Sequence, residues 1–73
     1  MASLKLTVAG MTCGHCQAKV AKALQSVAGT FGAAVFLDAG EAEVDFDAAR
    51  AQPALYVAAV RHAGYEATVI DQP

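Results

Sequence analysis

Alternation of hydrophobic and polar residues predicts the strands of this protein. In residues 3–9 every second side chain from position 4 is leucine or valine, which is the period of a strand with one buried face. The same period recurs in residues 33–37 and 42–46, and Gly40 between them favours a turn, so these two segments are predicted to form a β-hairpin. A last short strand is expected at residues 66–71.

A helical period governs two other segments. In residues 16–27 apolar side chains recur every three or four positions, which indicates an amphipathic helix that ends near Gly29. Pro53 suits the first turn of a second helix, which runs to residue 62 or 63 and stops at Gly64. The apolar stripe of this second helix is expected at Val57, Val60 and Ala63.

The order of these elements predicts an α+β fold, the ferredoxin-like βαββαβ sandwich, in which two helices pack on one face of a four-stranded antiparallel sheet. Two aromatic residues provide a check on the strand register. Phe36 has the wrong parity to share the core face of residues 33–37, so it should point from the open face of the sheet. Phe31 precedes the regular alternation and is expected to fill the core.

Length and composition indicate one domain. The 73 residues are enough for a single domain, 1–73, with its core at about 3–71. No apolar run reaches the roughly 18 residues of a membrane span, and residues 1–8 lack the features of a signal peptide, so a soluble cytoplasmic protein without membrane insertion is expected. Five basic and seven acidic residues without a basic cluster argue against nucleic-acid binding.

The two cysteines carry the candidate chemistry. Cys13 and Cys16 form a C-x-x-C pair, and without an export signal such a pair favours metal binding or redox chemistry over a structural disulfide. They stand where the first predicted strand leads into the first helix, whose unpaired N–H groups and dipole favour thiolates. Two thiolates suit Cu(I), and the similar Ag(I), at low coordination number, whereas Zn(II) seeks four ligands.

Beyond this pair, the chain resembles the heavy-metal-associated (HMA) domain family, which includes copper chaperones of the CopZ type and domains of copper-transporting P-type ATPases. The resemblance rests on residues 10–13 with Cys16, on the helix that follows, and on residues 44–47 and 63–67. It implies a non-enzymatic metallochaperone that holds one Cu(I) between Cys13 and Cys16. It also implies delivery by ligand exchange to a partner such as the metal-binding domain of a copper-transporting P-type ATPase. Relatives selective for zinc or cadmium tend to carry an acidic residue before the first cysteine, so Thr12 favours Cu(I).

Three residues near the cysteines are candidate modulators of the site. By the resemblance, Met11 is expected to be a core residue beneath the loop, although its thioether can also bind Cu(I). Tyr65 matches a tyrosine that bacterial copper chaperones place beside the metal loop, where its ring shields the site; the alternative is an aromatic that covers the end of the core. His15 is either a third, pH-sensitive ligand or an ordinary exposed side chain.

Lys19 and Lys22 are candidate docking residues, since basic side chains near a bis-thiolate complex compensate its charge and guide an acidic partner, although surface lysines are also common. His62 is expected to be solvated at a helix end and not to be a ligand. The expected assembly is a monomer or a metal-bridged homodimer. In transfer, Cys13 is expected to exchange first while Cys16 retains the ion.

Two other functions compete with the chaperone. The sequence Cys-Gly-His-Cys in residues 13–16 also occurs in protein disulfide isomerases, but the short chain, the missing tryptophan and the lack of a facing cis-proline strand argue against a dithiol oxidoreductase. The second alternative is a metal-sequestering or regulatory domain, in which the same two cysteines bind silver, zinc, cadmium or mercury. No acid/base pair or phosphate-binding loop supports hydrolysis or phosphoryl transfer.

Overall fold

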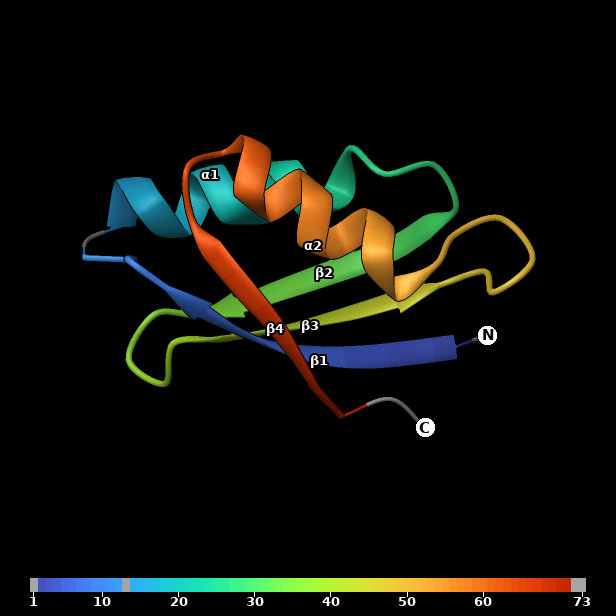
Figure 1. Cartoon of the computed structure of the whole chain (residues 1–73), viewed down its shortest axis with the longest axis horizontal. Coiled ribbons are helices and arrows are strands. Elements are labelled where there is room, and N and C mark those ends of the chain that lie inside the picture. The colour runs from blue at the N-terminus through green and yellow to red at the C-terminus, as the bar shows by residue number, and fades with distance from the viewer. Residues whose placement is uncertain (1, 13, 72–73) are drawn as a thin grey trace.

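The computed structural model describes residues 2–12 and 14–71 and has the predicted βαββαβ order. The elements are β1 (Ala2–Ala9), α1 (Gly14–Gln25), β2 (Thr30–Phe36), β3 (Glu41–Phe46), α2 (Pro53–His62) and β4 (Glu66–Asp71). The strands form one sheet in the order β2-β3-β1-β4, and every neighbouring pair is antiparallel. Both helices cover the same face of this sheet, which confirms the predicted ferredoxin-like sandwich (Figure 1).

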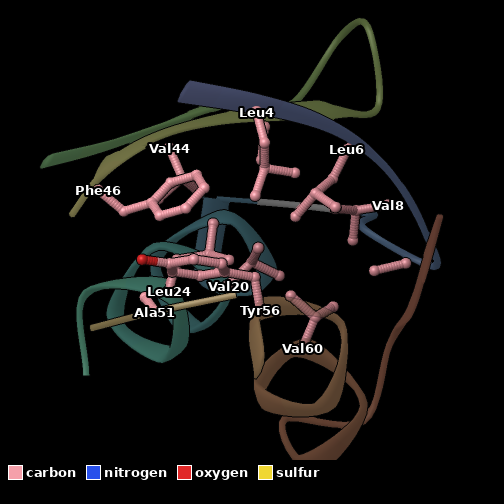
Figure 2. Packing of buried hydrophobic residues seen from close by; sticks show 12 residues of the cluster. Leu4, Leu6, Val8, Val20, Leu24, Val44, Phe46, Ala51, Tyr56 and Val60 are labelled. Carbon is pink, nitrogen blue, oxygen red and sulfur yellow. The ribbon is translucent and has the colours of Figure 1, made fainter. Parts of the chain in front are cut away.

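The core lies between the helical layer and the sheet. Tyr56 of α2 is fully buried, and its ring packs against the ring of Phe46 with centroids 5.4 Å apart. Figure 2 shows these two rings facing the aliphatic side chains of β1 and α1. The buried cluster comprises Leu4, Leu6, Val8, Val20, Leu24, Ala42, Val44, Phe46, Ala51, Tyr56, Val60 and Ala67. No helix among the described residues is long and apolar enough to cross a membrane.

A β-bulge at Phe31 makes one sequence prediction wrong. Thr30 pairs with Phe46 and Gly32 with Asp45, so Phe31 is an extra residue in β2 opposite β3. A bulge breaks the two-residue alternation. Phe31 therefore leaves the core and is 63% exposed. Beyond the bulge the alternation holds, and Phe36 is 45% exposed as its parity predicts.

The helices differ from their predictions in detail. α1 begins two residues earlier than expected, at Gly14, and ends at Gln25 rather than at residue 27. In α2 the fully buried side chains are Tyr56 and Val60, while Val57 is half-buried. Of the predicted stripe only Val60 is fully buried, Ala63 like Val57 is half-buried, and Tyr56 is a buried residue that the pattern did not predict.

Candidate metal centre

The loop between β1 and α1, where the C-x-x-C sequence begins, lies at one end of the sandwich (Figure 1). Gly10 leaves β1 with a φ of 96°, a backbone conformation that favours glycine. Met11 is half-buried and packs against the core, whereas Thr12 is exposed. The predicted ligand Cys13 lies outside the described residues. The Met11 side chain therefore packs on the core, and Thr12 lies beside the start of α1.

Cys16 lies in the first turn of α1 and is half-buried. Its Sγ is 3.8 Å from the Thr12 Oγ1, and either atom can be the donor of this contact. When the sulfur is a thiolate, only the hydroxyl can donate, so the contact then favours the form that binds a metal. The first four N–H groups of a helix lack intrahelical partners and add to the same preference. This end of α1 is suited to a thiolate ligand.

The end of α2 brings Tyr65 to the same loop. Gly64 has a φ of 100°, its N–H donates to the Arg61 oxygen at 3.0 Å, and the Tyr65 N–H donates to the Val60 oxygen at 3.2 Å. These two bonds form a Schellman motif, which fixes the direction of the chain after the helix. The half-buried Tyr65 ring packs on the core and lies against Gly10, where an added Cβ would be 3.4 Å from its Cδ1.

The other candidate residues lie on the surface around α1. His15 is exposed in the first turn. Lys19 and Lys22 are exposed and line a shallow groove between α1 and α2, together with His62 and three alanines. The structure therefore brings the two lysines and His62 to one surface, apart from the buried side of the loop. Within residues 2–12 and 14–71 no three His, Cys, Asp or Glu side chains are grouped to hold a metal ion.

Sequence reasoning missed one residue of this region. Gln17 directly follows Cys16, and its Nε2 donates a hydrogen bond of 2.8 Å to the main-chain oxygen of Val35 in β2. The helical period reports only which positions are apolar, so it carries no signal for a polar side chain that reaches a strand.

Comparison with known proteins agrees with the fold of this chain. The heavy-metal-associated domain profile matches residues 5–66, which is most of the chain. The chain belongs to this family. A solved structure of the CopZ metallochaperone superposes with a TM-score of 0.87 at 32% identity, over 90% of this domain and 98% of that chain. This HMA domain is therefore similar to CopZ over nearly the whole of both chains.

Two larger relatives contain a similar domain. Copper-transporting ATPase 2 of Rhizobium meliloti is 42% identical over 66 residues, which are 90% of this chain but 8% of the ATPase. Mercuric reductase of Serratia marcescens is 42% identical over 73 residues, which are the whole of this chain and 15% of that protein. The chain thus spans only a small part of these relatives.

Proposed function

We propose that this HMA domain is a Cu(I) metallochaperone that holds one Cu(I) between the thiolates of Cys13 and Cys16. The observation that supports this most is the place of Cys16, in the first turn of α1 with the Thr12 hydroxyl at its sulfur. A soft, monovalent ion suits two thiolates at low coordination number, whereas zinc prefers a closed set of four ligands. The similarity to CopZ, a copper chaperone, supports copper as the metal and delivery as its use.

Transfer proceeds by ligand exchange without a change in oxidation state. A partner thiol gives its proton to solvent, and the resulting thiolate adds to the bound Cu(I) to form a three-coordinate intermediate. The Cys13–Cu bond then breaks and the Cys13 sulfur takes up a proton, while Cys16 retains the ion until a second partner thiolate arrives. The half-buried Cys16, on the regular helix, is suited to leave last.

The proposed partner is an HMA domain of a copper-transporting P-type ATPase, reached in the cytoplasm by a monomer or by a metal-bridged homodimer. Exposed Lys19 and Lys22 stand on the helix that carries Cys16, and they favour a partner with an acidic surface. Tyr65 and Met11 act around the loop rather than as ligands: the Tyr65 ring covers Gly10 and Met11 anchors the loop in the core.

The test is a competitive titration of the reduced protein with Cu(I) and Zn(II) against chelators of known affinity. Tight Cu(I) binding at one equivalent, with much weaker Zn(II) binding, is the expected result. The variant with both Cys13→Ser and Cys16→Ser should lose Cu(I) binding, because serine hydroxyls are poor ligands for a soft ion. Zn(II) binding equal to or tighter than Cu(I) binding refutes the copper assignment.

A second candidate is the sequestration or regulation of another soft metal, with mercury favoured by the similarity to mercuric reductase. Measurement of Cu(I) transfer to an acceptor domain distinguishes a chaperone from a sequestering domain. A chaperone passes Cu(I) to a purified copper ATPase domain within seconds to minutes, whereas a sequestering domain retains it. Reduction of insulin at a rate near that of thioredoxin would instead support a dithiol oxidoreductase.

A further inference from the structure

The side chain of Gln17 joins the first turn of α1 to the sheet. Its amide nitrogen donates to the Val35 oxygen at 2.8 Å, in a partly buried position. A main-chain carbonyl only accepts, so the side-chain amide must present its NH2 group at this contact. Away from bulk water such a bond is electrostatically stronger than on an open surface. The contact is therefore a specific tether between two elements.

The acceptor, the Val35 oxygen, lies on an edge strand of the sheet. The sheet order is β2-β3-β1-β4, so β2 has a strand neighbour on one side only. Main-chain groups of an antiparallel strand point alternately to its two sides, and those on the open side of an edge strand need other partners. α1 packs along β2. The Gln17 side chain donates to the Val35 oxygen and so links the helix to this edge strand.

The start of α1 is where such a tether has most effect. The first turn of a helix has unpaired N–H groups and opens more easily than the middle of the helix. The buried side chains that hold α1 on the core are Val20 and Leu24, which lie beyond its first turn. Gln17 therefore restrains the turn that carries Cys16, ahead of the part of α1 held by burial.

We propose that Gln17 is a positioning residue for metal exchange, an inference that rests on the proposed function. The hydrogen bond to Val35 holds the first turn of α1 in place on β2 and so keeps the Cys16 sulfur beside Thr12. A fixed Cys16 retains the ion while the Cys13–Cu bond is exchanged. Gln17 touches neither the ion nor the thiolates in this role; it acts through the helix.

The first test uses the metal-free, reduced protein. Gln17→Met keeps the length of the side chain and removes the donor, Gln17→Lys keeps a donor, and Gln25→Met is the control on an exposed glutamine of the same helix. Gln17→Met should speed hydrogen exchange in the first turn, and alkylation of Cys16 in a Cys13→Ser background, by roughly fivefold, the effect of one lost hydrogen bond. Gln17→Lys should restore slow rates, and Gln25→Met should leave them unchanged.

The second test compares Cu(I) affinity in the same variants with Cys13 present. Gln17→Met should weaken binding by roughly fivefold relative to Gln25→Met, with rescue by Gln17→Lys. Equal rates and affinities in Gln17→Met and Gln25→Met overturn the inference. So does a uniform increase in exchange over the whole chain, which indicates a general loss of stability. If the unmodified protein binds no Cu(I) through its cysteines, the proposed function fails, while the exchange and alkylation rates still decide whether Gln17 holds the turn.

Discussion

At the scale of single residues, Thr30 provides the partner for the polar atom that Tyr56 carries into the core. The Tyr56 hydroxyl is 2.7 Å from the Thr30 Oγ1, which is also 3.3 Å from the Leu24 oxygen. A hydroxyl has one proton and a carbonyl only accepts, so Thr30 donates to Leu24 and Tyr56 donates to Thr30. The bulge at Phe31 turns Thr30 toward the core and makes this chain of bonds available.

Removal of this partner should destabilise the fold. We expect Thr30→Val to lower the free energy of unfolding by about 1–3 kcal/mol, because the Tyr56 hydroxyl then stays buried without a partner. The double change Thr30→Val with Tyr56→Phe should recover part of that loss, since no polar group is left unpaired. Urea denaturation measures both, with Thr68→Val on the exposed side of β4 as the control. A double variant as unstable as the sum of the two single variants would contradict the account.

Part of the candidate site could be predicted from residue types in the sequence, and part of it could not. The C-x-x-C pair is recognised by residue type and spacing, so Cys13 and Cys16 stand out as candidate ligands from sequence alone. The tether from Gln17 depends on an edge strand at the right distance from the helix, and no local pattern encodes that distance. The assignment of Cys13 and Cys16 as ligands remains a prediction, and Cys13 lies outside the described part of the chain.

At the scale of elements, alternation and helical period predicted all six segments and their order. The last strand, at residues 66–71, and the second helix, which starts at Pro53, agree with their predicted bounds. The failures lie where an element is irregular. Periodicity assumes an unbroken ladder, so the bulge in β2 misplaced Phe31. Helical periodicity also takes no account of side-chain size. It therefore missed Tyr56, whose large, fully buried ring makes it the main anchor of α2.

The turn between α1 and β2 offers a test of element packing. Gly29 and Gly64 both have positive φ values, of 93° and 100°. An added Cβ at Gly29 would be 2.8 Å from the Cβ of Arg50, whereas one at Gly64 meets no atom within 4 Å. The Gly29 oxygen also accepts the Asp47 N–H at 2.8 Å, so the two loops cannot separate freely.

Gly29→Ala should therefore destabilise the protein more than Gly64→Ala does. Both changes place alanine at a positive φ, at about 1 kcal/mol, and only Gly29→Ala adds a steric clash, for a total of about 2–4 kcal/mol. Thermal or urea unfolding of the two variants measures the difference. Equal losses in the two variants would show that the contact with Arg50 relaxes without a penalty.

At the scale of the whole molecule, basic side chains lie on the helical layer and acidic side chains gather on strand β3 of the sheet. α1 and α2 contain Lys19, Lys22 and Arg61 and no acidic residue. The strand β3 carries Glu41, Glu43 and Asp45, and a single described ion pair on this strand, Lys5–Glu43 at 3.3 Å, offsets part of that charge. We therefore propose that the helical layer, which also holds the start of α1 with Cys16, is the surface on which an acidic partner docks.

This separation predicts how Cu(I) transfer responds to charge reversal and to salt. Lys19→Glu changes a charge one turn beyond Cys16. Arg50→Glu makes the same change in the loop between β3 and α2, at the opposite end of the sandwich from the loop between β1 and α1 (Figure 1). We expect Lys19→Glu to slow transfer to an acidic acceptor domain by about tenfold at low salt, and Arg50→Glu to have little effect, because steering acts locally. Stopped-flow transfer rates of the unmodified protein and of Lys19→Glu should converge at increasing salt, because salt screens the charges and shortens the range of their attraction. If Arg50→Glu slows transfer as much as Lys19→Glu does, net charge rather than the helical surface governs the encounter, and docking on α1 is wrong.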